Sequence, residues 1–133
     1  MTIPHPIVDR IREAIDRHDL DALVGCFAPE FASRQPCHPA RDFQGTAAVR
    51  ANWTQIFGGV PDLRATLVTS HADGDTVWCE WDWHGTRRDG APFAMRGVTI
   101  LHLEGDRVAS HRFYMEPVER ESSNLETIRQ AIL

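Results

Sequence analysis

The chain of 133 residues is 42% hydrophobic and 25% charged, which is the composition of one globular domain and excludes disordered and low-complexity proteins. Its formal net charge is -5, with acidic and basic residues intermixed, so we expect no nucleic-acid partner, because such proteins carry a basic patch. The three cysteines lack C-x-x-C spacing, the histidines match no zinc signature, and no apolar run is long enough to cross a bilayer. These features predict a reduced, cytoplasmic protein with no metal site and no membrane partner.

The first half of the chain predicts three amphipathic helices. Their apolar faces are formed by residues three or four positions apart: Ile7, Val8, Ile11 and Ile15, then Leu20, Leu23, Val24 and Phe27, then Val49, Trp53, Ile56 and Phe57. We expect the first helix to end near His18, the second to run from a cap at Asp19 to Pro29, and the third to begin at a cap at Thr46. Residues 30–43 contain two prolines and no clear period, which predicts a loop with room for one short strand.

The second half predicts strands joined by short turns. The expected strands are Leu63 to Ser70, Thr76 to Gly85, Met95 to Glu104 and Arg107 to Met115. Such short connections imply an antiparallel meander, so the fold class is α+β with helices and sheet in separate layers. We assign residues 1–118 to the domain and residues 119–133 to a polar linker and a short C-terminal helix, capped at Ser123.

The turns also predict which strand residues share a face. Two-residue turns at Asp89-Gly90 and Gly105-Asp106 make Trp83 oppose Arg96 and make Ile100 oppose His111. The strongly apolar face, which we expect to meet the helices, then holds Val77, Cys79, Trp81, Trp83, Val98, Ile100, Phe113 and Met115, with Arg96, His102 and His111 as its polar members. A register slip of one residue would reverse the faces.

Three stretches carry a resemblance to a known family. They are DTVWCEWDWHG at Asp75–Gly85, RGVTILHLEGDRV at Arg96–Val108 and HRFYMEP at His111–Pro117. The chain resembles the nuclear transport factor 2-like superfamily, and within it the SnoaL-like polyketide cyclase and ketosteroid isomerase-like branch, from about Ile7 to Glu116. The resemblance implies three N-terminal helices on a strongly curved antiparallel sheet that forms a cone-shaped pocket. It is specific for fold and not for function, because this superfamily includes isomerases, cyclases, dehydratases, epoxide hydrolases and non-catalytic binders.

The resemblance also suggests where chemistry would occur. Family members often use an Asp in the pocket as a base, but the predicted pocket face has no acidic strand residue, so histidine is the expected proton carrier. We predict that His111 shuttles a proton, His102 assists it and Arg96 stabilises an oxyanion, without a cofactor. The predicted pocket lining is Trp53, Phe57, Trp81, Trp83, Val98, Ile100, Phe113 and Met115, with His38 and Asp42 as loop contributors.

Several alternatives remain open at this stage. The histidines and tryptophans could instead be packed core residues, and Arg96 is equally explained as a guanidinium stacked on an indole at the pocket mouth. The pocket could also bind a small hydrophobic, cyclic ligand as a non-catalytic or accessory domain. A third alternative is a protein-interaction domain with a filled cavity. Trp78 and Tyr114 fall on the other sheet face, through which relatives commonly dimerise, so we expect a homodimer that buries them.

Overall fold

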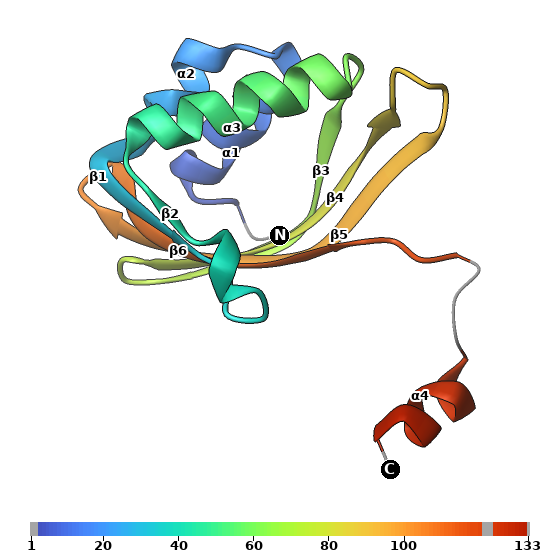
Figure 1. Cartoon of the computed structure of the whole chain (residues 1–133). Helices are drawn as coiled ribbons and strands as arrows, with labels where there is room; N and C mark the ends of the chain where they lie inside the picture. The colour runs from blue at the N-terminus through green and yellow to red at the C-terminus, as the bar shows by residue number, and fades with distance from the viewer. Residues whose placement is uncertain (1–2, 121–123, 133) are drawn as a thin grey trace.

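The computed structural model describes residues 3–120 and 124–132, which form an α+β fold with helices on one face of a curved sheet (Figure 1). The elements in chain order are α1 (Pro6–Arg17), α2 (Leu20–Val24), β1 (Phe27–Arg34), the 3-10 turn η1 (Pro39–Arg41), β2 (Phe43–Gln44), α3 (Thr46–Gly59), β3 (Arg64–Asp73), β4 (Thr76–Thr86), β5 (Pro92–Glu104), β6 (Arg107–Pro117) and α4 (Leu125–Ile132). The sheet has six strands in the order β2-β1-β6-β5-β4-β3. The expected fold class is confirmed.

The N-terminal helices follow their local sequence signals closely. His18 ends α1 in the left-handed conformation, at φ 54°, and Asp19 caps α2 by accepting a hydrogen bond from the Ala22 N–H at 3.1 Å. Two details differ from expectation. The second helix ends at Val24, so Phe27 belongs to β1, and the residue that caps α3 is Gly45 instead of Thr46.

Strand β1 takes up the first five residues of the expected loop, 30–34, and makes the sheet mixed instead of purely antiparallel. It runs parallel to β6, and Ser33 is the register partner of His111. Pro29, which was expected to stop a helix, lies in β1 between the paired residues Phe27 and Ala32, where the register shifts. A proline is tolerated there because the irregular stretch does not require its missing N–H.

Strand β5 has the opposite facing to the one expected, because both of its hairpins differ by one residue. At the β4–β5 end, Thr86 pairs with Pro92 across a loop of residues 87–91, so Trp83 opposes Met95 instead of Arg96. At the β5–β6 end the turn at residues 105–106 is as expected, but the register then shifts and Leu101, not Ile100, opposes His111. Since alternate residues of a strand point to opposite faces, the slip turns the whole of β5 over.

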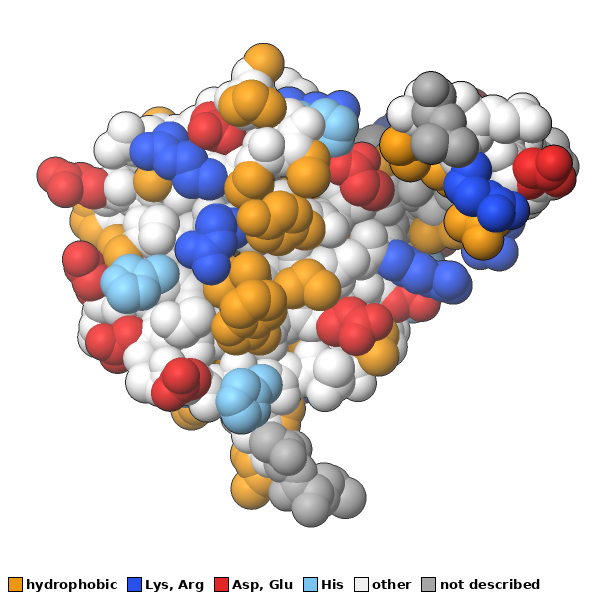
Figure 2. Space-filling model, turned by 90° about the horizontal axis from the view of Figure 1, so that it is seen from below, with side chains coloured by type: hydrophobic (Ala, Val, Ile, Leu, Met, Phe, Trp, Pro, Cys, Tyr) orange, Lys and Arg blue, Asp and Glu red, His pale blue; other side chains and the backbone are white. Residues whose placement is uncertain are grey.

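The core lies between the helices and the concave face of the sheet. The fully buried side chains include Ile7, Val8 and Ile15 from α1, Val77 and Cys79 from β4, and Met115 from β6. The convex face, called here the outer face, shows hydrophobic side chains gathered at its centre (Figure 2), and its exposed large apolar residues include Trp78 of β4 and Tyr114 of β6. None of the described helices is long and apolar enough to span a membrane.

The C-terminal helix α4 carries no buried residue. Its start is capped by Asn124, whose Oδ1 accepts hydrogen bonds from the Thr127 N–H at 2.9 Å and hydroxyl at 3.0 Å. The cap expected at Ser123 lies outside the described residues.

Candidate functional site

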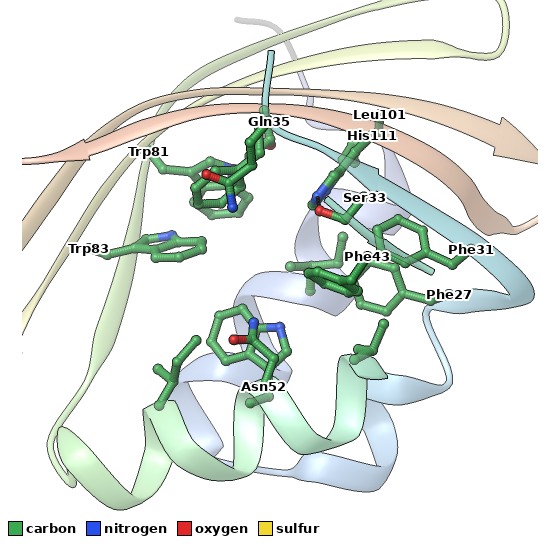
Figure 3. Close-up of a pocket in the computed structure, with 16 residues that line it drawn as sticks. Phe27, Phe31, Ser33, Gln35, Phe43, Asn52, Trp81, Trp83, Leu101 and His111 are labelled. Atoms are coloured by element: carbon green, nitrogen blue, oxygen red, sulfur yellow. Dashed lines mark hydrogen bonds between the residues drawn. The ribbon is translucent and has the colours of Figure 1, made fainter. Parts of the chain in front are cut away.

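A cavity of about 90 Å³ lies between the concave face of the sheet and helices α1 and α3 (Figure 3). Its wall is mostly apolar and aromatic, and the polar side chains that reach it are Ser33, Gln35, Asn52, Thr99 and His111. None of the described residues that line it carries a carboxylate, a guanidinium or an ammonium group. The cavity therefore has the usual composition of a small-molecule site, an apolar wall with a few neutral polar groups.

Three aromatic residues from different elements surround Trp83 of β4. Its ring centroid lies 5.4 Å from that of Trp53 of α3, 6.4 Å from that of Trp81 and 6.1 Å from that of Phe113 of β6, with tilted or edge-on ring planes. Such tilted arrangements are favoured between aromatic rings. Together they form a wall suited to a flat or cyclic apolar ligand.

Among the described residues that line the cavity, His111 is the titratable one. Its Nε2 lies 2.8 Å from the Oγ of Ser33, which is itself 1% exposed, and its ring meets Phe31 edge-on at 4.9 Å. Burial away from water disfavours the charged ring and lowers the pKa of His111 to about 4. His111 is therefore neutral at pH 7, and the parallel pairing of β1 with β6 brings the serine hydroxyl beside it.

The two indole N–H groups of β4 differ in their partners. The Trp81 indole donates a hydrogen bond to the Thr99 hydroxyl at 3.0 Å. The Trp83 Nε1 is buried and has no hydrogen-bond partner among the described residues. An unpaired buried donor costs about 1–3 kcal/mol, so this N–H stands out among the buried side-chain polar atoms of the described residues.

The structure removes two of the three predicted catalytic residues from the cavity. Arg96 and His102 are exposed on the outer face, where the Arg96 Nε pairs with the Asp82 Oδ2 at 3.4 Å. Val98 and Ile100 lie on the same face. Ile100 is buried, at 5% exposed, but it is not part of the hydrophobic core cluster. Assigning these residues to the pocket was wrong, because the register slip of β5 replaces them with Thr99 and Leu101.

The other predicted pocket residues divide into two groups. Trp53, Trp81, Trp83, Phe113 and His111 line the cavity. Phe57 and Met115 do not: Phe57 stacks on His18 with ring centroids 4.4 Å apart, and Met115 is 1% exposed within the core.

The two loop residues stabilise the loop instead of lining the cavity. The His38 Nε2 lies 2.6 Å from the Glu116 Oε1 at the end of β6. Asp42 accepts a hydrogen bond from the Gln35 N–H at 2.7 Å, and its other oxygen lies 3.8 Å from the Arg34 Nη1. The loop is thereby held beside the strand end from which Gln35 reaches the cavity.

Sequence reasoning missed several lining residues. The sequence does indicate that Asn52 faces the cavity, because it lies three residues after Val49 and four before Ile56 and so shares their face of α3. No local pattern in the sequence indicates that Ser33 lies beside His111, because that contact depends on a parallel pairing between residues 78 positions apart in the chain. Within the part of the chain that the structure describes, no group of three or more His, Cys, Asp or Glu residues is placed to hold a metal ion.

Solved structures with the same fold come from several bacteria. A hypothetical protein with a ketosteroid isomerase-like fold from Catenulispora acidiphila, solved in complex with trimethylamine, is 19% identical with a TM-score of 0.74, covering 84% of this chain and 87% of its own. A provisionally assigned polyketide cyclase from Sinorhizobium meliloti is 22% identical with a TM-score of 0.66, covering 84% and 94%. An NTF2-like protein of unknown function from Burkholderia pseudomallei is 16% identical with a TM-score of 0.71, covering 83% and 88%. These likenesses establish the fold alone.

Comparison with family models assigns the chain to a family within this fold. Among curated proteins, none matches the sequence significantly. The family model of the SnoaL-like domain matches residues 8–111, which include every strand of the sheet at least in part and end at the histidine of the cavity. The protein is a member of the SnoaL-like domain family.

Proposed function

We propose that the domain binds a small, hydrophobic, ring-containing ligand in this cavity and that His111 accepts a proton from it. The observation that carries the proposal is the neutral imidazole of His111, hydrogen-bonded to Ser33 inside an aromatic cavity. A neutral imidazole can accept a proton, and a water-poor site strengthens the polar interactions that form during the transfer. The reaction class is a cofactor-independent isomerisation, cyclisation or dehydration.

The proton path follows from the Ser33–His111 contact. The Ser33 hydroxyl donates its proton to His111 Nε2 as it accepts one from the ligand, and the electron pair left on the ligand moves onto a ligand oxygen. Isomerisation returns the proton to a second ligand atom, and dehydration releases it with a leaving hydroxyl as water. Because a pKa of about 4 makes His111 a weak base, the ligand proton must be acidic, as beside a carbonyl group.

A proton-abstraction probe tests the role of His111. Isoxazole is a single aromatic ring that opens when a base removes its C3–H proton and the N–O bond breaks, and its enolate product is measured by ultraviolet absorbance. We expect the wild-type protein to accelerate this opening, with kcat/KM falling below pH 4 as His111 becomes protonated, and His111→Gln to lower it by about 100-fold. His102→Gln, on the outer face, is the matched control and should keep the wild-type rate.

The alternative function is binding without chemistry, as a ligand-binding or accessory domain. It is supported by the lack of a carboxylate among the described lining residues. Equal rates for wild type and His111→Gln, with the probe still bound by both, would select this alternative.

We also propose that two copies associate through the outer face. Trp78 and Tyr114 are 47% and 37% exposed there, where hydrophobic side chains gather (Figure 2). Such exposed apolar side chains, close together and bordered by charges, are typical of an interaction surface.

Light scattering at micromolar concentration tests the dimer. We expect the wild-type protein to have the mass of two chains and Trp78→Glu to have the mass of one, because a buried charge without a partner opposes association. Leu125→Glu places the same charge on α4, 72% exposed, and should leave the dimer intact. A wild-type protein with the mass of one chain would contradict the proposal.

The cytoplasmic location expected from the sequence belongs with these proposals. Cys26, Cys37 and Cys79 are all unbridged, and Cys37 is exposed. Free thiols of this kind are typical of proteins in a reducing compartment, which supports the location.

A further inference from the structure

The indole N–H of Trp83 is a hydrogen-bond donor whose acceptor the folded chain does not supply. The side chain is 6% exposed, and Nε1 is the one buried side-chain nitrogen or oxygen atom without a partner among the described residues. Its neighbour Trp81 occupies the same wall, yet its N–H is used by the Thr99 hydroxyl. The difference is therefore specific to Trp83 and is not a general feature of indoles in this core.

The unpaired donor belongs to the cavity wall. Trp83 lines the cavity, and Figure 3 shows the edge of its ring that carries the nitrogen facing the side where Trp81 and Gln35 lie. Buried donors in native proteins are almost always paired, with protein, water or ligand atoms. A buried donor that the chain leaves unpaired in the wall of an apolar cavity is available to an acceptor that enters the cavity.

The other residues that line the cavity indicate that this acceptor is uncharged. An anionic carboxylate would enter a cavity whose described lining offers no cationic side chain, and burying an unpaired charge is costly. A cation such as a methylated ammonium would find aromatic faces, but it has no lone pair for the Trp83 N–H. A neutral oxygen satisfies the donor without bringing a charge, and a volume of about 90 Å³ leaves room for no more than one ring.

We propose that the ligand of this domain is an uncharged monocyclic compound with a carbonyl oxygen, which accepts a hydrogen bond from Trp83 Nε1. This inference rests on the proposed ligand-binding function and names the class of ligand. It also assigns Trp83 a specificity role that is separate from proton transfer. The hydrogen bond would withdraw electrons from the carbonyl group and acidify the adjacent C–H, which is the type of proton that a weak base requires.

A pair of ligands of equal shape tests the proposal. Cyclohexanone and methylenecyclohexane differ in one group, a carbonyl oxygen in place of a terminal CH₂, so only the ketone can accept a hydrogen bond. In ¹⁵N-resolved spectra of the full chain, we expect cyclohexanone to move the Trp83 indole N–H proton downfield and methylenecyclohexane to leave it without that shift. The indole signals are assigned with the single Trp→Phe variants.

The affinities of variants give a second, independent measurement. Trp83→Phe should weaken cyclohexanone binding about tenfold more than methylenecyclohexane binding, since only the ketone loses a hydrogen bond. Trp81→Phe is the matched control, and it should change both affinities by the same factor because its N–H is bound to Thr99.

The outcomes separate this inference from the function on which it rests. If both ligands bind and neither the indole shift nor the affinity ratio depends on the oxygen, the cavity is a binding site and the role of Trp83 is overturned. If tetramethylammonium binds and the two ring compounds do not, the aromatic wall recognises a cation and the ligand class is overturned. If none of the three binds at millimolar concentration, both this inference and the proposed ligand-binding function are overturned.

Discussion

Replacing Gly97 with alanine is expected to lower the free energy of unfolding by about 3 kcal/mol or more. Gly97 lies on β5 opposite Trp81 and Met115 and has φ 151°, a backbone conformation that L residues rarely adopt. A Cβ at this position would lie 2.1 Å from the Tyr114 carbonyl oxygen and 2.7 Å from the Met115 Cα. Both are backbone atoms of β6, which cannot move aside without breaking the ladder that holds His111.

The magnitude matters because a domain of this size is stable by only about 5–15 kcal/mol in total. Urea unfolding followed by circular dichroism measures the change. Gly58→Ala is the matched control: Gly58 lies in the last turn of α3, where an added Cβ would meet no atom within 4 Å beyond its own helix backbone and chain neighbours. Alanine there should be neutral or stabilise by about 0.5–1 kcal/mol. A Gly97→Ala protein as stable as Gly58→Ala would show that β5 and β6 can separate locally at no cost.

The features predicted correctly from the sequence are those set by neighbours in the chain. The end of α1 at His18 and the cap of α2 at Asp19 depend on backbone and side-chain groups within a few residues. The apolar spacing of the third helix likewise placed Trp53 on the cavity. The place of Ser33 depends on a parallel pairing, and no local signal in β1 specifies its partner strand.

The facing of the strands shows how errors in register combine. The β4–β5 hairpin differs from expectation by one residue because its loop spans residues 87–91, and the β5–β6 hairpin differs by one because of the shift near Leu103. The two slips cancel between β4 and β6. His111 and Phe113 therefore share the cavity with Trp81 and Trp83 as expected, and only the residues of β5 change sides. The catalytic assignments of Arg96 and His102 failed for this one geometric reason.

The stability of the domain is expected to depend on pH through His111. The pKa of its imidazole is about 4 in the folded domain, against an ordinary value of 6.5 that applies to the unfolded chain. Above pH 6.5 both states are neutral at this residue and its contribution to stability is fully present. As the pH falls from 6.5 towards 4, the unfolded chain takes up a proton that the folded domain does not, so the free energy of unfolding decreases.

The difference between the two pKa values corresponds to about 3 kcal/mol, lost between pH 6.5 and pH 4 and nearly constant below pH 4. Other groups titrate in the same range, so the test is a difference between proteins: urea unfolding at several pH values for wild type and for His111→Gln, whose amide can still bond to Ser33. We expect wild type to lose about 3 kcal/mol more than this variant, whereas the loss in His102→Gln should parallel that of wild type. Parallel curves for wild type and His111→Gln would mean that the folded domain protonates His111 as easily as a water-exposed chain does. The imidazole would then be partly charged near neutral pH, and the apolar cavity could not keep it in the neutral form that proton acceptance requires.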